Sequence, residues 1–237
     1  MERAPFQFKQ FAVDDKGCAM KVGTDGVLLG AWANVPRDGR FLDIGTGCGL
    51  IALMLAQRSL AHIAAIEIEN DAIQQSEQNF KNSHWADRLT AIEGAVQQYN
   101  PGSKFNLIVS NPPFFSNSLK APEKQRSAAR HNDTLPPEAL LYAVDKLLST
   151  DGIFAFILPV QEAQSLIAIA QSYHLYLNRS CLVFSKEGKQ PNRLMGELSR
   201  SEYTLIQETL CIRTIDGKYS QAYRNLTEPF YLMLKDV

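Results

Sequence analysis

Residues 42–55 read LDIGTGCGLIALML, and this stretch decides the fold. It begins as an apolar strand, passes through glycines at positions 45, 47 and 49, and continues directly into an apolar helix. Glycines let the chain turn sharply off a strand and let a ligand approach the backbone, and the following helix offers free N–H groups. The stretch therefore predicts a strand–turn–helix unit that binds a nucleotide-like ligand.

The glycine spacing separates this turn from a dinucleotide site. The dinucleotide pattern Gly-x-Gly-x-x-Gly needs a third glycine where this chain has Leu50, whereas Gly45, Gly47 and Gly49 follow Gly-x-Gly-x-Gly after the acidic Asp43. This pattern resembles the loop of S-adenosylmethionine-dependent methyltransferases, in which the acid faces the cationic methionine part of the cofactor. The alternative is that the glycines form only a tight structural turn.

Strands and helices alternate through the middle of the chain. Alternation of this kind indicates an α/β fold, with a doubly wound, Rossmann-like parallel sheet covered on both faces. The expected strands are 40–45, 61–69, 89–94, 105–110 and 152–159, and the expected helices are 50–58, 70–82, 137–149 and 160 to about 173.

The two ends of the chain add to this sheet. Segments 175–186 and 202–216 read as an antiparallel pair of strands joined by a loop over 187–200, which completes a seven-stranded sheet. Residues 6–13 alternate like a strand, and 24–33 read as a helix capped by Thr24 or Asp25. We expect one domain over residues 1–237, with a short N-terminal extension over about 1–36.

Composition narrows the class of protein. The 237 residues are 45% hydrophobic and 21% charged, with a net charge of -1, so binding to nucleic acid would depend on a local basic patch. No apolar run has the length of a signal peptide or membrane span, which predicts a cytoplasmic protein. The four cysteines and four histidines are scattered, and we expect reduced cysteines and no metal site.

Acidic and small residues follow the next two strands. Glu67 ends the second strand, where a carboxylate can accept both hydrogen bonds of a ribose diol. At the third strand, Ala95 stands where methyltransferases of this kind often carry an acidic residue that hydrogen bonds to the adenine amino group of the cofactor. The adenine is then expected to contact the Ala95 backbone and apolar neighbours, or a polar group elsewhere.

The fourth strand ends in Asn111, Pro112, Pro113 and Phe114. The prolines hold the asparagine in an extended conformation. The Asn111 side-chain oxygen and the Pro112 carbonyl can both accept hydrogens from one planar NH2 group, and Phe114 can stack on the ring that carries it. This arrangement predicts methyl transfer to an amine nitrogen; the alternative is an ordinary turn with an edge hydrophobe.

Several segments together resemble one enzyme family over almost the whole chain. They read FKQFAVDDKGCAMKVGTDGVLLGAWA, LDIGTGCGLIALMLAQR, SNPPFF, RSAARH and LTEPFYL. The chain is similar to the bacterial tRNA adenine-N6 methyltransferases that act on the anticodon loop of a valine tRNA. The resemblance implies an S-adenosylmethionine site that includes Lys21, Thr24 and Asp25 at its entrance, with Asp43, Gly45, Gly47, Gly49 and Glu67 inside.

A basic segment after the fourth strand is a candidate for tRNA contacts. It carries Lys120, Lys124, Arg126, Arg130 and His131 against Glu123 alone. A weaker candidate set consists of Lys186, Lys189, Arg193 and Arg200.

Three other functions remain open at this level. An Asn-Pro-Pro site also suits a release-factor glutamine N5-methyltransferase or a ribosomal RNA guanine-N2 methyltransferase, and a cofactor-binding RNA-docking module needs no catalysis. The first usually carries an N-terminal helical domain and Tyr where this chain has Phe114. We expect a monomer that acts on tRNA without metal or membrane.

Overall fold

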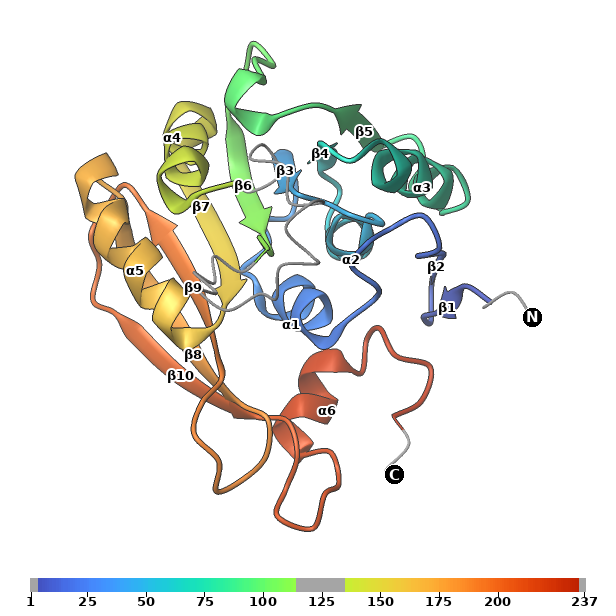
Figure 1. The fold of residues 1–237 in the computed structure, drawn as a ribbon, viewed down its shortest axis with the longest axis vertical. Coiled ribbons are helices and arrows are strands. Elements are labelled where there is room, and N and C mark those ends of the chain that lie inside the picture. The colour runs from blue at the N-terminus through green and yellow to red at the C-terminus, as the bar shows by residue number, and fades with distance from the viewer. Residues whose placement is uncertain (1–3, 114–134, 235–237) are drawn as a thin grey trace, which may run out of the picture.

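The computed structural model describes residues 4–113 and 135–234, and in them eight strands form one sheet (Figure 1). The strand order is β10-β8-β9-β7-β6-β3-β4-β5. Five neighbouring strands, from β7 to the edge strand β5, are parallel and confirm the doubly wound α/β fold. They are β3 (Arg40–Ile44), β4 (His62–Glu67), β5 (Leu89–Glu93), β6 (Phe105–Ser110) and β7 (Leu148–Leu158).

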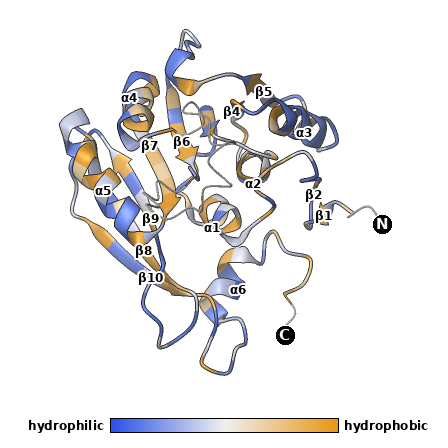
Figure 2. Cartoon of the chain, viewed as in Figure 1, coloured by the Kyte–Doolittle hydropathy of each residue, from blue (hydrophilic) through white to orange (hydrophobic). Residues whose placement is uncertain are grey.

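Helices cover both faces of the sheet. One hydrophobic core takes side chains from α1 (Thr24–Trp32), α2 (Leu50–Arg58), α3 (Asn70–Lys81) and α6 (Gln221–Thr227), and the other from α4 (Pro137–Leu147) and α5 (Val160–Ala170). Residues 50–56 of α2 are all buried, which explains their unbroken apolar run. Figure 2 colours β7, between the two cores, largely hydrophobic. Among the helices of the described residues, none combines the length and the hydrophobicity that a bilayer-spanning segment needs.

The C-terminal part of the sheet differs from the prediction. The segment expected as a loop contains β9 (Arg193–Ser199), which lies between β8 (Tyr176–Phe184) and β7 and is antiparallel to both. Strand β10 (Ile206–Cys211) pairs with β8 in parallel, so the expected antiparallel pair of 175–186 with 202–216 is wrong. The described residues therefore contain eight main-sheet strands and not seven.

Strand β9 contains two residues that look unsuited to a strand. A Cβ on Gly196 would lie 2.5 Å from the Phe156 ring, so the close approach of β7 requires glycine. Glu197 is 5% exposed and is paired with Arg179. Both residues depend on partners elsewhere in the chain, which the local sequence does not reveal.

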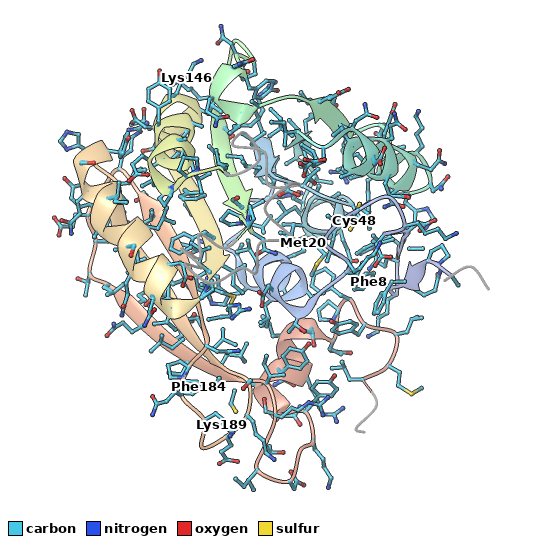
Figure 3. All side chains as sticks on the ribbon, in the orientation of Figure 1. Phe8, Met20, Cys48, Lys146, Phe184 and Lys189 are labelled. Atoms are coloured by element: carbon cyan, nitrogen blue, oxygen red, sulfur yellow. The ribbon has the colours of Figure 1, made fainter. Side chains whose placement is uncertain are left out.

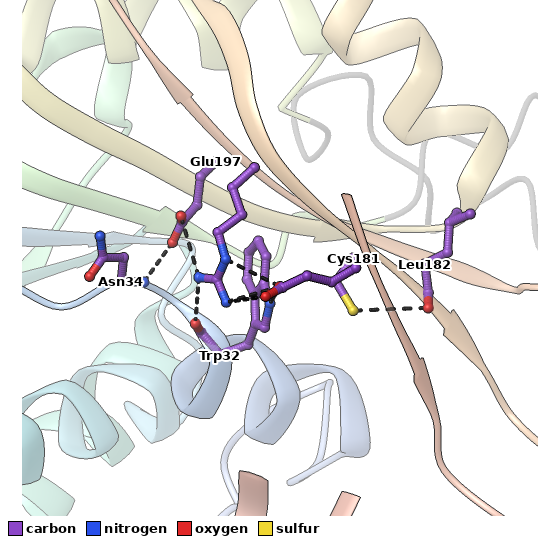
Figure 4. A network of polar contacts seen from close by, with 7 residues as sticks. Trp32, Asn34, Cys181, Leu182 and Glu197 are labelled. Atoms are coloured by element: carbon purple, nitrogen blue, oxygen red, sulfur yellow. Dashed lines mark hydrogen bonds and ion pairs between the residues drawn. The ribbon is translucent and has the colours of Figure 1, made fainter. Parts of the chain in front are cut away.

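A polar network attaches the C-terminal strands to α1 (Figure 4). The Arg179 guanidinium lies 4.1 Å from the centre of the Trp32 ring and pairs with Glu208 and Glu197. Glu208 also accepts a 2.7 Å hydrogen bond from the Trp32 indole N–H, and Glu197 accepts one from the backbone N–H of Asn34. Helix α1 is thereby fixed against β8, β9 and β10.

The N-terminal strand is shorter than expected. It divides into β1 (Phe6–Gln7) and β2 (Ala12–Val13), which pair with each other. Helix α1 forms as predicted, but Gly23 occupies its N-cap position without a side-chain hydrogen bond. The proposed cap by Thr24 or Asp25 is wrong, because the Asp25 carboxylate is instead 2.8 Å from Arg193 Nε.

Asp43 holds the turn between β3 and α2. One carboxylate oxygen, Oδ2, accepts hydrogen bonds from Thr46 Oγ1 at 2.7 Å and from the Ala52 N–H at 3.2 Å. The side chain is fully buried, and this burial raises the pKa of Asp43 to about 7, although the two hydrogen bonds oppose the change. The ligand-free protein therefore favours a protonated Asp43 below neutral pH.

This raised pKa predicts how stability depends on pH. Because the pKa of Asp43 is about 7 in the folded chain and 3.8 for an ordinary aspartate, its contribution to the free energy of unfolding falls as pH rises between these values and levels off above them. Asp43→Asn keeps the acceptor oxygen without the charge. Urea unfolding at about pH 5 and about pH 8 should show a smaller loss of stability for the variant than for the parent chain. Equal losses would contradict the assignment.

Candidate functional site

The sheet topology brings two sequence motifs to one edge. Strand order reverses beside β3, since β4 and β5 extend the sheet on one side and β6 on the other. In open α/β sheets, ligands bind at the carboxyl ends of the strands at such a reversal. Ile44 pairs with Ser110 at the ends of β3 and β6, so the glycine turn and Asn111 leave the sheet side by side.

A cavity of about 800 Å³ opens at this edge. This volume is typical of small-molecule sites. Both motifs line it, together with the ends of β4 and β5. An N-terminal segment that passes beside the glycine turn also lines it. In Figure 3, the label Met20 marks this N-terminal segment and the label Cys48 marks the glycine turn. The main lining segments are 17–20, 66–69, 94–98 and 110–113, with Gly45 and Gly47.

The three glycines of the turn have different roles. All have positive φ angles, of 70° at Gly45, 55° at Gly47 and 82° at Gly49. A Cβ on Gly45 or Gly47 would meet no atom within 4 Å and would occupy space that a ligand can use. A Cβ on Gly49 would lie 2.5 Å from the Phe80 ring. Gly45 and Gly47 therefore keep the cavity open, and Gly49 allows α3 to pack.

Glu67 lines the cavity and is already hydrogen bonded to the backbone. Its Oε2 accepts from Gly47 N at 2.9 Å, and its Oε1 accepts from the N–H groups of Ile68 and Glu69. A carboxylate offers about four acceptor directions, so one remains, on Oε2. As it stands, the side chain has room for one ribose hydroxyl, and a two-hydroxyl contact requires it to rotate.

Asp43 lies behind the turn and not on the cavity wall. Its second oxygen, Oδ1, is buried without a hydrogen-bond partner among the described residues. A buried acceptor without a partner lowers the stability of the fold unless a donor or a positive charge compensates it. The site therefore fits a ligand that brings a cationic or N–H group to the turn.

Ala95 lines the cavity beside two polar side chains. Gln97 and Gln98, at the end of a short 3-10 helix (Val96–Gln98), line the same wall. No acid stands at position 95, and among the residues that line the cavity these two amides are the polar side chains nearest in the chain to Ala95. The structure thus supplies candidates for the polar contact that the sequence left open.

Asn111 is half-buried on the cavity wall, and no described residue hydrogen bonds to its carboxamide. The preceding Ser110 is fully buried and donates from Oγ to the Ile44 carbonyl at 2.9 Å, which fixes the chain at this point. Pro112 and Pro113 follow on the same wall. The side-chain acceptor of Asn111 is therefore positioned and available.

The three residues expected at the entrance do not line the cavity. Lys21 Nζ donates to the carbonyls of Asp15 and Lys16, Asp25 pairs with Arg193, and Thr24 begins α1. The neighbouring residues 17–20 line the wall instead. The motif was close to the site, but no periodicity or charge pattern indicated which of its residues face inward.

The main basic candidates and Phe114 lie outside the described residues. Of the weaker set, Arg193 is paired with Asp25 and Arg200 with Asp145, whereas Lys189 is exposed. In the described part of the chain, no group of three His, Cys, Asp or Glu side chains could hold a metal ion. The outside residues are Phe114, Lys120, Lys124, Arg126, Arg130 and His131.

Curated relatives match nearly the whole chain. A protein named tRNA1(Val) (adenine(37)-N6)-methyltransferase from Bacteroides thetaiotaomicron is 47% identical over 97% of this chain and 98% of its own. One of the same name from Photobacterium profundum is 45% identical over 97% and 98%. Residues 21–133 match the family model of the methyltransferase small domain.

Solved structures share the fold at low sequence identity. A predicted O-methyltransferase from Agrobacterium tumefaciens superimposes with a TM-score of 0.67 at 16% identity, over 90% of this chain and all of the other. A glycopeptide N-methyltransferase complexed with S-adenosylmethionine gives 0.54 at 12%, over 75% and 95%. With its class I methyltransferase fold and these full-length relatives, the chain belongs to the tRNA1(Val) (adenine(37)-N6)-methyltransferase family.

Proposed function

We propose that this protein transfers a methyl group from S-adenosylmethionine to the exocyclic N6 nitrogen of an adenine in a valine tRNA. The observation that carries the proposal is the cavity lined by both Gly45 and the carboxamide of Asn111. The names of the relatives support the choice of adenine and of tRNA. We also propose a monomer in the cytoplasm.

Asn111 and Pro112 orient the nucleophile. The Asn111 side-chain oxygen and the Pro112 carbonyl each accept one hydrogen of the adenine NH2 group, which directs the nitrogen lone pair into the cavity. Neither acceptor needs to be charged, because the cofactor supplies the reactive carbon and orienting the nucleophile in line with it lowers the barrier. The proton that the nitrogen loses after transfer goes to solvent or along these hydrogen bonds.

The glycine turn and its neighbours hold the cofactor. When bound, S-adenosylmethionine supplies the electrophilic methyl carbon. Gly45 and Gly47 would leave room for its methionine part against the backbone. The carboxylate of Asp43, buried behind the turn, would attract its cationic end through charge, and Glu67 would accept a hydrogen bond from a ribose hydroxyl. The side-chain amide of Gln97 or Gln98 would make the polar contact to the cofactor's adenine ring beside Ala95.

Phe114 and the basic residues at 120–131 remain predictions for contacts with the tRNA. An anticodon loop presents unpaired bases, which can enter a pocket without being extracted from a duplex. We expect Phe114 to stack on the target base and the basic residues to contact phosphates.

Nucleoside mass spectrometry tests the substrate. Purified protein incubated with S-adenosylmethionine and an unmodified valine tRNA should produce N6-methyladenosine. A transcript with guanine in place of adenine 37 is the matched control and should give none. Methylation of a release-factor glutamine or of a ribosomal RNA guanine, with unchanged tRNA, would overturn the proposal in favour of those acceptors.

Replacing Asn111 tests the nucleophile contact. Asn111→Ala should lower kcat on the order of 100-fold, the scale seen when one preorganised polar contact is lost from an active site. Asn225→Ala, on the exposed side of α6, is the control and should keep parental turnover. Calorimetry should show similar S-adenosylhomocysteine affinity in both variants. Near-normal turnover of Asn111→Ala would contradict the role.

A pair of glycine substitutions tests the cofactor turn. Gly45 and Gly188 have φ angles of 70° and 78°, and a Cβ on either meets no atom within 4 Å. Alanine at each position therefore costs a similar backbone strain of about 1–2 kcal/mol. Only Gly45→Ala should weaken S-adenosylhomocysteine binding in calorimetry, by about tenfold or more. Equal affinities would show that the ligand does not approach this turn.

A further inference from the structure

Two of the scattered cysteines meet at the wall of the cofactor cavity. Cys48 lies between Gly47 and Gly49 in the glycine turn, and Cys18 lies in the N-terminal segment that lines the cavity. Both are free cysteines with 5% and 4% of their surface exposed, and both belong to the same hydrophobic core cluster, where their side chains lie close enough to interact. This contact could not be predicted from the sequence, because no short spacing joins the two positions.

Asn79 holds the two cysteine-bearing segments together. Its buried amide nitrogen donates to the carbonyls of Cys48 and Asp14, both at 2.8 Å, and its oxygen accepts from the Asp14 N–H. Four residues after Asp14, Cys18 closes a turn by donating its N–H to the Asp15 carbonyl. The pairing of the thiols therefore rests on a built, hydrogen-bonded junction and not on a chance approach of two loops.

The two thiols have opposite chemical character. Interaction with the Cys48 thiol and the charge of Lys21 lower the pKa of Cys18, although burial, Glu67 and Asp15 oppose this. The same interaction and burial raise the pKa of Cys48. A thiol with a lowered pKa is the more readily oxidised of such a pair, and the neighbouring thiol can then form the disulfide with it.

The cavity gives this pair its access to solvent. Cys18 lines the open cavity, so a small oxidant reaches it by the path that the cofactor takes. The other two cysteines lie elsewhere, on strands β8 and β10. A bound nucleoside ligand would cover Cys18 and leave Cys211 unaffected.

We propose that Cys18 and Cys48 form a redox-sensitive site whose oxidation opposes cofactor binding. A peroxide is the oxidant: the Cys18 thiolate attacks one peroxide oxygen and gives a sulfenic acid, while the other oxygen leaves and takes up a proton. Cys48 sulfur then attacks the Cys18 sulfur and water leaves, so that two thiols and hydrogen peroxide give one disulfide and two waters. A dithiol reductant reverses the reaction.

The disulfide acts on the turn that receives the cofactor. A disulfide holds its sulfurs only about 2 Å apart, closer than any thiol contact, and so draws Cys48 toward Cys18. Gly47 and Gly49 allow this movement, and Gly47 lines the cavity. Binding and oxidation are then linked reciprocally, since a ligand that favours the dithiol form binds the disulfide form more weakly by the same factor.

Peroxide treatment followed by peptide mass spectrometry tests the site. Full-length protein without ligand should give a Cys18–Cys48 disulfide before Cys211 is oxidised, and dithiothreitol should remove it. Saturating S-adenosylhomocysteine should slow its formation, because the bound ligand covers Cys18 in the cavity. Cys211→Ser should form the disulfide at the parental rate, whereas Cys18→Ser and Cys48→Ser should each yield no intramolecular disulfide.

Calorimetry with S-adenosylhomocysteine gives a second readout that does not depend on methyl transfer. The oxidised protein should bind S-adenosylhomocysteine about tenfold more weakly. Titration in glutathione buffers should show that adding the ligand shifts the reduction potential of the Cys18–Cys48 disulfide by the matching amount, about 30 mV. The inference would be overturned if Cys18 and Cys48 stayed reduced while Cys211 was oxidised. It would also be overturned if both redox forms bound S-adenosylhomocysteine with equal affinity. The inference rests on the proposed cofactor site; failure of tRNA methylation with intact ligand binding would count against the proposed function alone.

Discussion

The parallel pairing of β3 with β6 is the constraint on which the site depends. Their last residues, Ile44 and Ser110, are partners, so two segments far apart in the sequence leave the sheet at the same point. One is a glycine turn that accepts a ligand against its backbone, and the other is an asparagine stiffened by prolines. A one-residue shift of register between these strands would move Asn111 along the strand axis and turn the β6 side chains to the opposite face of the sheet, away from Gly45.

Buried polar side chains fix the positions of these neighbouring segments relative to each other. Asp43 ties the turn to α2, the Ser110 hydroxyl ties β6 to β3, and Asn79 ties the turn to the N-terminal segment. Of these three side chains, Asp43 keeps an unpaired buried oxygen among the described residues, which costs stability in the absence of a donor. That cost is consistent with a site that is completed by its ligand.

The sequence predicted what depends on local pattern and missed what depends on distant partners. The apolar runs of β3, β6 and α2 and the glycine spacing placed the central sheet and one wall of the cavity. Strand β9 was missed because Gly196 and Glu197 fit a strand only beside Phe156 and Arg179. Likewise, Asp25 looked like a cap or ligand contact, and its partner Arg193 lies 168 residues further along the chain.

Methyl transfer as proposed depends on a side-chain amide and a neighbouring carbonyl that hold an adenine amine at the cavity lined by the glycine turn. The most direct test is the structure of the protein with S-adenosylhomocysteine and its tRNA. We expect the adenine N6 within about 3.2 Å of both Asn111 Oδ1 and the Pro112 carbonyl oxygen, facing the ligand sulfur. An N6 nitrogen held by other groups, or a cofactor bound away from Gly45 and Gly47, would contradict it.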